Sequence, residues 1–370
     1  MKLIKSFIII LILFSSCSYD KSILDTAISS AIVNQSNTTI PLEVRNRGIW
    51  LIGGSSSAST LSPISEVDLY DPVDNKWYEG ITQLPKPVMF AGVTANNGKI
   101  YVIGGMTSAE NLTRVVQIFD IESHTWSYGP DFPVAIQGLK AFSIETNVYT
   151  VGGSFTNDAT GAISRIMKLN KLYNFWLALY DIAGVNTNYR IDAGVSTLEN
   201  VMFFGGGRDS NGTYQNTNQL HYVSDYTATA AGTALPAQRV ALSAASYYYQ
   251  DKKYVFFTGG IFATGITSQP IISTLTQNTF YYYIPAYGAT AQSMNTGQPM
   301  TKQRAYHTSV VWGHTLYVFG GLYNTTVWDD FEKLDNLNTA NLATASWTSV
   351  GTMPRPRFGG EAVTLYKIFN

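Results

Sequence analysis

Cysteine and histidine are scarce in this chain. Cys17 is the only cysteine among 370 residues, and a lone thiol cannot form a disulfide within the chain. The four histidines fall in different predicted elements, a turn, an outer strand, an inner strand and the start of an apolar strand: His124, His221, His307 and His314. A metal site needs several ligands that converge on one point. We therefore expect no metal and no cofactor.

Charged residues are also few, at 13% of the chain, and the formal net charge is only −1. This balance gives no positive field that could hold a polyanion, so binding of nucleic acid is not expected. Neither a Ser-His-Asp arrangement nor a pair of carboxylates at catalytic spacing stands out. The body of the chain lacks a sustained helical period, and its 24 tyrosines and 18 phenylalanines favour strands.

Glycine, in contrast, forms a regular signal. Six Gly-Gly doublets follow one another at spacings of 51, 48, 53, 54 and 61 residues, namely Gly53-Gly54, Gly104-Gly105, Gly152-Gly153, Gly205-Gly206, Gly259-Gly260 and Gly320-Gly321. Nearly all close a short apolar run, such as residues 49–52 and 316–319, which indicates a buried strand. We expect glycine at these strand ends because a side chain there would block the backbone of a neighbouring strand.

The first two repeats share a further pattern between the doublets. Residues 66–71 and 116–120 each end in an aspartate, and a tryptophan follows six residues later, Trp77 in the first repeat and Trp126 in the second. An apolar residue and a proline come next in both. A strand, a turn and a second strand therefore follow each doublet strand.

The doublets, the Tyr-Asp or Phe-Asp pairs and the spaced tryptophans resemble kelch repeats. Trp176 and Trp347 keep the third and sixth repeats in register, whereas the fourth and fifth repeats lack the tryptophan and leave residues 220–300 without sharp boundaries. The resemblance covers about residues 46–370. It implies an all-β fold, a six-bladed kelch β-propeller with four antiparallel strands in each blade.

The two ends of this domain complement each other. Residues 357–366 read as a strand with no doublet strand behind it, and residues 48–54 form a doublet strand with no inner strand before it. We expect the C-terminal strand to become the innermost strand of the blade that residues 48–54 begin. This pairing would close the ring and remove two exposed sheet edges.

The first residues have the pattern of an export signal. Lys2 and Lys5 precede an apolar run at residues 7–14, which is too short to span a bilayer as a helix. Small residues then lead to Cys17. This order resembles a bacterial lipoprotein signal and implies that residues 1–16 are removed and that the Cys17 thiol is acylated.

An ordinary secretory signal is the alternative, since Phe14 is bulkier than the residue usually found three places before the lipidated cysteine. In the lipoprotein interpretation, residues 17–45 are a polar tether and lipid chains hold the protein at a membrane. The expected location is the bacterial cell envelope. Ser18 after the cysteine resembles lipoproteins of the outer membrane, with the domain at that membrane or facing the periplasm.

Alignment of the predicted innermost strands brings arginine to one position in four of the six strands: Arg190, Arg239, Arg304 and Arg357. Val88 and Gly138 take this position in the other two. Because side chains alternate along a strand, residues two places further on share a face, and there we expect Phe90, Lys140, Asp192, Ala241, Tyr306 and Gly359. Glu361 lies two places beyond Gly359.

Two interpretations of the arginines stay open. In the first, each guanidinium group bonds to backbone carbonyls, as similar arginines do in kelch repeats. In the second, the arginines converge on an anionic ligand at the ring axis, such as a sugar acid or an acidic peptide. Specificity would then come from neighbouring side chains, namely Lys140, Asp192, Tyr306 and Glu361.

Three functions follow from the resemblance. Kelch proteins similar to galactose oxidase hold copper beside a Tyr-Cys crosslink, but Cys17 lies outside the ring, so that cofactor cannot form. Periplasmic kelch proteins that are sialic-acid mutarotases imply an alternative, a sugar-acid mutarotase or epimerase with Asp192 or Glu361 as the base. The leading interpretation is a non-enzymatic, monomeric module that binds a protein or a glycan at the ring mouth. The loops at 157–162, 209–217 and 263–278 all follow doublets and would project from one side.

Overall fold

The computed structural model describes residues 40–181, 190–223, 229–250, 252–262, 279–283 and 294–365. The expected export signal, Cys17 and the tether up to residue 39 lie outside these ranges. The loop at 263–278 and the C-terminal strand beyond residue 365 lie outside them as well. None of the helices in the described part is long and apolar enough to cross a membrane.

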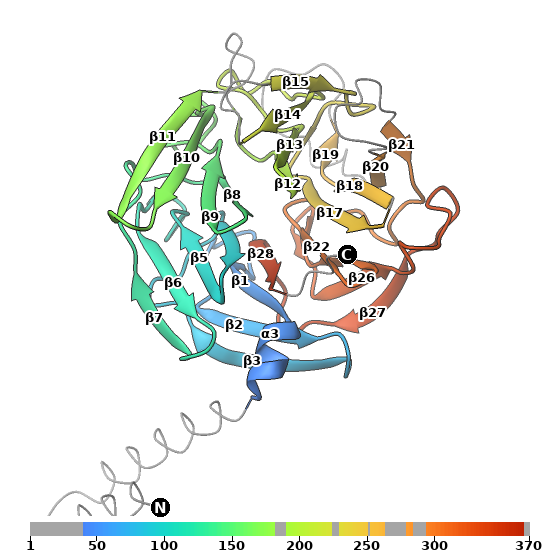
Figure 1. Ribbon diagram of the computed structural model, residues 1–370, viewed down its shortest axis with the longest axis horizontal. Helices are drawn as coiled ribbons and strands as arrows, with labels where there is room; N and C mark the ends of the chain where they lie inside the picture. Colours follow the sequence, from blue (N-terminus) through green and yellow to red (C-terminus); the bar gives the residue numbers. More distant parts are fainter. Residues whose placement is uncertain are drawn as a thin grey trace, which may run out of the picture. The chain divides into compact units, whose positions relative to one another are not determined.

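The described residues form an all-β propeller with almost no helix (Figure 1). Six four-stranded antiparallel sheets contain most of its strands. From the axis outward, the first three sheets consist of β28 (Phe358–Thr364), β1 (Ile49–Ser55), β2 (Glu66–Asp71) and β3 (Lys76–Gln83); β4 (Gly92–Asn96), β5 (Lys99–Ile103), β6 (Val116–Asp120) and β7 (Thr125–Tyr128); and β8 (Lys140–Ile144), β9 (Asn147–Val151), β10 (Arg165–Asn170) and β11 (Phe175–Asp181).

The other three sheets consist of β12 (Gly194–Leu198), β13 (Val201–Gly205), β14 (Asn218–Tyr222) and β15 (Thr229–Gly232); β17 (Ser243–Tyr249), β18 (Lys252–Thr258), β20 (Thr279–Tyr283) and β21 (Met294–Thr296); and β22 (Thr308–Trp312), β23 (Thr315–Phe319), β26 (Asp330–Leu334) and β27 (Thr348–Thr352). Two short ribbons, β16 (Arg239–Val240) with β19 (Ile261–Phe262) and β24 (Leu322–Tyr323) with β25 (Thr326–Val327), complete the described strands.

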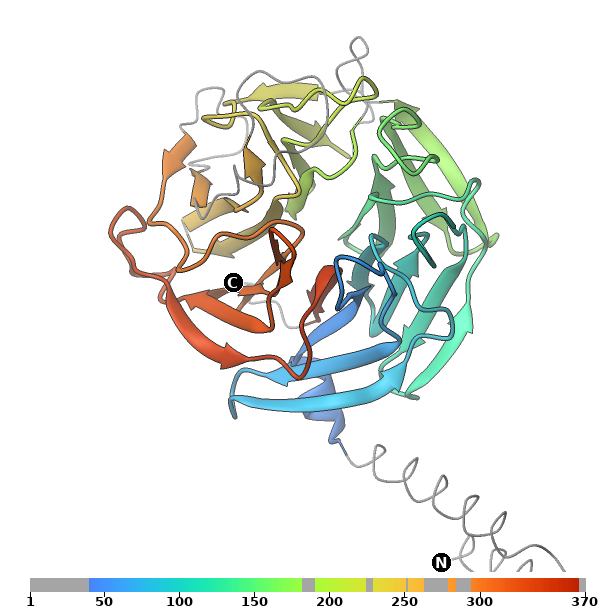
Figure 2. The same ribbon diagram turned by 180° about the vertical axis from the view of Figure 1, so that it is seen from behind.

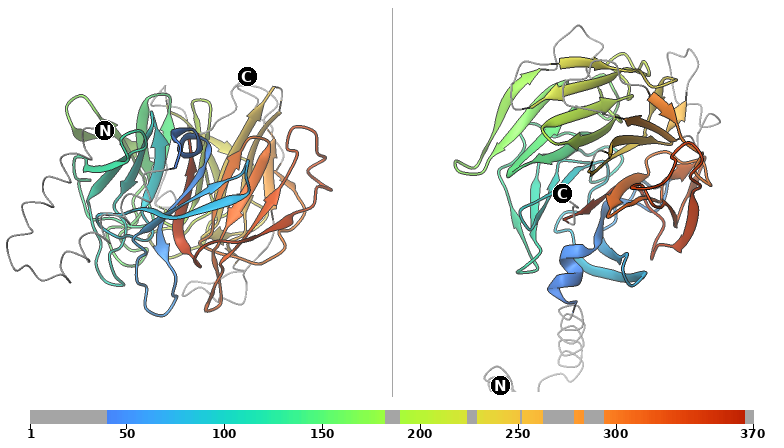
Figure 3. Two further views of the ribbon diagram at one scale, coloured as in Figure 1. Left: turned by 90° about the horizontal axis from the view of Figure 1, so that it is seen from below. Right: turned by 45° about the vertical axis from the view of Figure 1, so that its right-hand side comes forward.

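The innermost strands lie around one axis in the order β4, β8, β12, β17, β22 and β28, and β28 lies beside β4 (Figures 1 and 2). Side views show the sheets standing next to one another around this axis (Figure 3). Hydrophobic side chains of neighbouring sheets fill the spaces between them. One core cluster joins Phe203 of β13 to Phe257 of β18, and another joins Leu51 of β1 to Phe319 of β23. The second strands are buried on both faces, which explains their continuous apolar runs.

The spaced tryptophans also join neighbouring sheets. Trp126 donates its indole N–H to Thr82 Oγ1 of the preceding sheet at 2.9 Å, and Trp176 donates to Pro130 O at 3.0 Å. Trp347 makes the same kind of bond with Gln298 O at 3.1 Å. A buried indole N–H needs such a partner, so these three tryptophans each join the outer part of a sheet to the sheet before it.

The last described strand, β28, pairs with the first, β1. Strand β28 runs antiparallel to β1, with Ile49 opposite Thr364 and Ser55 opposite Phe358. The domain begins slightly earlier than expected, because residues of the predicted tether form the helix α3 (Leu42–Arg47). Val44 of this helix is buried, and Arg47 forms an ion pair with Asp71 of β2 at 2.6 Å.

Candidate functional site

Each glycine doublet lies where the backbone of the next sheet passes closely. A Cβ atom at Gly320 would lie 2.2 Å from Arg357 O, and one at Gly53 would lie 2.5 Å from Val88 O. Both glycines have a positive φ, 60° and 65°, in the region that favours glycine. Close approach and backbone conformation together therefore require glycine at this position.

The second glycine of every doublet donates its N–H to a carbonyl of the next sheet. The six pairs are Gly54 with Val88 (3.0 Å), Gly105 with Ile136 (2.7 Å), Gly153 with Arg190 (2.8 Å), Gly207 with Arg239 (2.7 Å), Gly260 with Arg304 (2.9 Å) and Gly321 with Arg357 (2.8 Å). The fourth doublet is therefore Gly206-Gly207 and not Gly205-Gly206. Ile136, and not Gly138, shares the position of the arginines, so the predicted register of this one strand is wrong by two residues.

The four arginines all make the same contact. The Nη1 group of each donates to the carbonyl of the first doublet glycine in its own sheet: Arg190 to Gly206 (2.8 Å), Arg239 to Gly259 (3.1 Å), Arg304 to Gly320 (2.6 Å) and Arg357 to Gly53. All four residues are at most 4% exposed. Burial lowers the pKa of Arg190, Arg239 and Arg357 to about 10.

Two of the arginines also contact buried carboxylates. Arg304 Nη2 lies 2.7 Å from Glu332 Oε1, and both side chains are fully buried. Arg357 Nη2 lies 2.8 Å from Asp68 Oδ2. The contacts of the four guanidinium groups favour the structural interpretation, because they are directed at carbonyls and carboxylates of their own sheets and are buried away from the axis.

A ring of backbone groups narrows the axis next to the arginines. We call it the axial ring; it consists of the residues two places after the shared position, Phe90, Gly138, Asp192, Ala241, Tyr306 and Gly359. All six have a positive φ between 52° and 63°. Five N–H groups each donate to the carbonyl of the neighbouring ring member, at 2.7–2.9 Å: Phe90 to Gly359, Gly138 to Phe90, Ala241 to Asp192, Tyr306 to Ala241 and Gly359 to Tyr306.

Asp192 forms an ion pair on the doublet side of the axial ring. Its Oδ2 lies 3.0 Å from both Nε and Nη2 of Arg208, the residue that follows the fourth doublet. The negative charge of Asp192 raises the pKa of Arg208. Burial raises the pKa of nearby Tyr306, and the Asp192 carboxylate adds to that effect. The structure thus brings together two predicted site residues, Asp192 and Tyr306, and adds Arg208, which the sequence does not single out.

Lys140 and Glu361 lie on the other side of the axial ring and form an ion pair across the axis, from β8 to β28. Thr308 Oγ1 donates to the second carboxylate oxygen of Glu361 at 3.2 Å. Lys140 was predicted to share a face with Asp192. The corrected register instead places it level with Glu361, four residues after Ile136.

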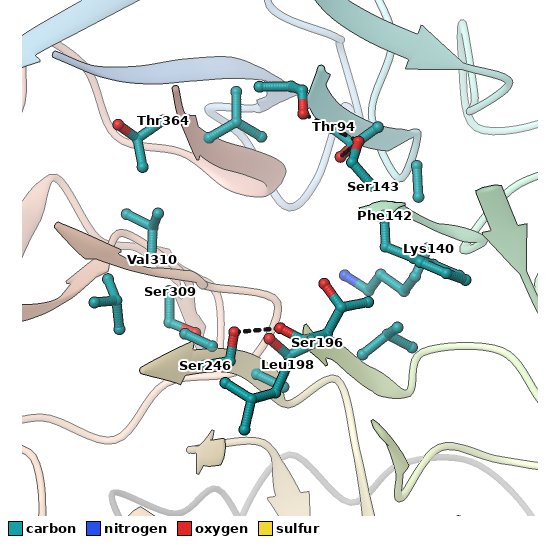
Figure 4. Close-up of a pocket in the computed structure, with 18 of the residues that line it drawn as sticks. Thr94, Lys140, Phe142, Ser143, Ser196, Leu198, Ser246, Ser309, Val310 and Thr364 are labelled. Atoms are coloured by element: carbon teal, nitrogen blue, oxygen red, sulfur yellow. Dashed lines mark hydrogen bonds between the residues drawn. The ribbon is translucent and has the colours of Figure 1, made fainter. Parts of the chain in front are cut away.

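A central cavity of about 520 Å³ begins at this ion pair and is lined by all six innermost strands (Figure 4). It extends to the hairpin turns that connect the first and second strands, where Glu145, Glu199 and Gly313 line it. None of the four arginines is among its lining residues. The cavity therefore lies toward the end of the propeller opposite the doublets, whereas the sequence predicts a ligand at the level of the arginines.

Within the ranges that the structure describes, no group of three His, Cys, Asp or Glu side chains is placed to hold a metal ion. Three histidines instead contact oxygen atoms. His124 Nε2 lies 2.9 Å from Ile81 O, His307 Nε2 lies 2.9 Å from Thr258 Oγ1, and His314 Nδ1 lies 2.9 Å from the hydroxyl of Tyr247. Burial lowers the pKa of His221 to about 4.

Comparison with known proteins agrees with the fold. The kelch motif family matches residues 87–133. The solved structure of YjhT superposes with a TM-score of 0.62 and covers 82% of this chain and 97% of that chain, at 13% sequence identity. At this identity the likeness concerns the fold alone.

Curated relatives match shorter parts. Kelch-like protein 35 of Mus musculus is 28% identical over 188 residues, which is 48% of this chain and 30% of that protein. Beta-scruin of Limulus polyphemus is 26% identical over 117 residues, 30% of this chain and 12% of that protein. The matches thus span less than a third of the length of these relatives. Together with the kelch motif, they support a kelch-repeat family for this chain.

Proposed function

We propose that this protein is a non-enzymatic interaction module, a kelch propeller of six blades closed by β28, whose doublet face binds a partner protein. The doublet face is the set of loops that follow the doublets, of which residues 55–65, 106–115, 154–163, 208–217 and 322–328 are described. The observation that carries the proposal is that side-chain hydrogen bonds hold several of these loops in one conformation. Ordered loops lose little conformational entropy on binding.

Single aspartates hold two of the loops in shape. Asp209, which is 4% exposed, accepts hydrogen bonds from the N–H groups of Asn211 at 2.8 Å and Thr213 at 3.0 Å. Asp158 accepts from the N–H of Thr160 at 2.9 Å and from its hydroxyl at 2.6 Å. Side-chain bonds of this kind fix tight turns, so the two loops present a preformed surface.

An aromatic side chain and an ion pair give this face the features of a binding site. Phe155, in the third loop, is 54% exposed. Its neighbour Asn157 bonds to Glu110 O of the second loop at 3.2 Å, which joins the two loops. Arg208 and Asp192 lie near the axis. An exposed aromatic residue beside polar groups is typical of the centre of a protein interface.

The alternative, a sugar-acid mutarotase, has weaker support from the geometry. It needs guanidinium groups that face a ligand carboxylate, and the four predicted arginines instead donate to doublet carbonyls. Asp192 is paired with Arg208, and Glu361 is paired with Lys140. A carboxylate that already bonds to a cation of the protein is less accessible to a ligand than a base with no such partner.

Export and lipid anchoring at Cys17 belong to the proposal and rest on the sequence alone. In a bacterial host, the full chain should incorporate an alkyne-tagged fatty acid and sediment with membranes. A Cys17→Ser variant should lose the label and leave the membrane fraction, because no other thiol is present. Labelling that persists in Cys17→Ser, or an unlabelled wild-type protein, would contradict the anchor.

The interaction proposal is tested with the purified protein on an array of recombinant cell-surface proteins and glycans. We expect specific binding to a protein that Phe155→Ser weakens by about tenfold or more, as is usual for an aromatic residue at the centre of an interface. Tyr173→Ser is the matched control. Tyr173 is 72% exposed in the turn between β10 and β11, at the other end of the sheet.

NMR of anomer exchange with N-acetylneuraminate separates the two functions. The interaction module should not accelerate the exchange. If the wild-type protein accelerates the exchange and Asp192→Asn does not, the interaction module is contradicted and the mutarotase is supported. Equal loss of protein binding in Phe155→Ser and Tyr173→Ser would show that the doublet face is not the contact surface.

A further inference from the structure

We infer that the central cavity is a second binding site, which takes a short neutral saccharide through the end of the propeller opposite the doublet face. This inference does not rest on the proposed protein interaction, which uses other residues and another face. It rests on the enclosure of the cavity, the type of side chain that lines it and the distribution of charge around it.

The cavity is closed at one end and bordered by hairpin turns at the other. Bonded backbone groups of the axial ring narrow the axis at the doublet end, and the space among the ring residues holds only about 30 Å³. Beyond the Lys140 and Glu361 pair the axis widens to the cavity of about 520 Å³. This volume lies within the range of about 300–1,000 Å³ that is usual for small-molecule sites.

Each of the six innermost strands contributes a hydroxyl to the wall. Figure 4 shows these side chains around the cavity, and they are Thr94 of β4, Ser143 of β8, Ser196 of β12, Ser246 of β17, Ser309 of β22 and Thr364 of β28. A hydroxyl both donates and accepts hydrogen bonds. Six of them around one axis can bond to a ligand that is itself rich in hydroxyls.

Several of these hydroxyls already use their proton within the protein. Ser246 donates to Thr197 O at 2.6 Å, Ser309 donates to Ser243 Oγ at 2.7 Å, and Thr364 donates to Gly48 O at 3.2 Å. Their oxygen atoms keep lone pairs that can accept. The wall is therefore stronger as an acceptor than as a donor, which suits a ligand that supplies O–H donors.

Charge around the cavity opposes an anionic ligand. Its lining includes three carboxylates, Glu145, Glu199 and Glu361, and one ammonium group, Lys140. Lys140 is paired with Glu361, and Lys253, outside the lining, is paired with Glu199 at 2.8 Å, so the three carboxylates exceed these two cations by one. A sugar acid would enter a site with excess negative charge and few free donors, so electrostatic repulsion and unmet hydrogen bonds would both weaken its binding. A neutral saccharide meets neither penalty.

The lining also has apolar surface for the C–H faces of a sugar ring. Val195 of β12, Val310 of β22 and Tyr248 of β17 border the cavity and are partly exposed, whereas Phe142 and Tyr247 in the same lining are 4% and 2% exposed and belong to the core between the sheets. The hydroxyls of the wall can bond to the hydroxyl groups of a hexose, and its apolar side chains can contact the C–H faces of the sugar ring. We therefore choose glucose and maltose as probes and glucuronate as the anionic comparison.

The test is protection of a single thiol from chemical modification. In the full chain with Cys17→Ser, Ser196→Cys places the only thiol in the cavity, and Thr348→Cys on the outer strand β27 places it at an exposed site as the matched control. Millimolar glucose or maltose should slow the reaction of the cavity thiol with methyl methanethiosulfonate severalfold. The control thiol should react at an unchanged rate, and glucuronate should protect less than glucose.

A second measurement does not depend on the introduced thiol. Saturation-transfer NMR should show maltose contact with the wild-type protein, and Thr94→Val, which removes one hydroxyl at nearly constant shape, should weaken this signal while Thr348→Val leaves it unchanged. The inference is overturned if the cavity thiol does not react at all. It is also overturned if no neutral sugar protects that thiol, if glucuronate protects it better, or if Thr94→Val binds maltose like wild type. Loss of protein binding in Phe155→Ser bears only on the doublet face.

Discussion

Ending the chain after Pro354, which removes β28, is expected to abolish cooperative unfolding of the whole propeller. Strand β1 would keep β2 but lose its inner partner along the pairing from Ile49 to Ser55. Phe358 and Val363, 3% and 9% exposed, each contribute about 1.5–3 kcal/mol through burial. The truncation also takes away ring contacts, since Gly359 bonds to both Phe90 and Tyr306.

A buried charge adds to this loss. Asp68 is 1% exposed and is paired with Arg355 at 3.0 Å and with Arg357 at 2.8 Å. Removing both arginines leaves the carboxylate buried without a cation, which costs about 3–5 kcal/mol. Together with the lost burial, this approaches the total stability of about 5–15 kcal/mol that domains have. The measurement is urea unfolding followed by near-ultraviolet circular dichroism and tryptophan fluorescence.

A permuted chain is the matched control for the truncation. Residues 355–365 are placed ahead of Leu42 through a flexible linker, so that the same strand reaches β1 by a new connection. Cooperative unfolding should return, because the pairing and the buried ion pairs are restored. If the truncated protein unfolds cooperatively at the urea concentration of the full chain, β28 does not close the ring.

The strands and doublets could be predicted because their signals are local. Apolar runs such as residues 316–319 are buried on both faces, and the glycine that follows meets a carbonyl of the next sheet, as Gly320 meets Arg357 O. No local sequence pattern marks the residues of the axial ring. Of its six left-handed positions only two hold glycine, Gly138 and Gly359, while Phe90, Ala241 and the others adopt a positive φ without glycine. The residue types therefore do not mark this level of the strands. An alignment by residue type puts Lys140 two places out of register.

The direction of the arginines and the cavity wall depend on tertiary structure. The register of β22 against β23 determines which carbonyl Arg304 reaches. It places Gly320 O at 2.6 Å from Arg304 Nη1. In a short strand, a serine or threonine such as Ser196 gives no indication in the sequence that it borders a cavity. That six of them border one axis follows only from the packing of six sheets, and no single strand carries that information.

Glu332→Ala is expected to destabilise the protein by about 3–5 kcal/mol, because it leaves Arg304 buried without its closest carboxylate. Glu332 Oε1 lies 2.7 Å from Arg304 Nη2, and its Oε2 accepts from the N–H of Thr301 at 2.6 Å. Both side chains are fully buried. The free energy of unfolding is measured in urea. Asp131→Ala is the control; it breaks the exposed pair with Arg114 and should cost at most about 1 kcal/mol.

A double variant separates the effect of a buried unpaired charge from that of lost packing in this prediction. Arg304→Met with Glu332→Leu replaces both charges with apolar side chains, so no unpaired ion remains, and such replacements of buried pairs are often neutral in stability. The double variant should therefore be more stable than Glu332→Ala by about 2 kcal/mol or more. Asp330, 3.3 Å from Arg304 Nη2, is the other carboxylate that contacts this guanidinium. If Glu332→Ala costs less than about 1 kcal/mol, Asp330 alone neutralises the arginine and Glu332 serves only the N–H of Thr301.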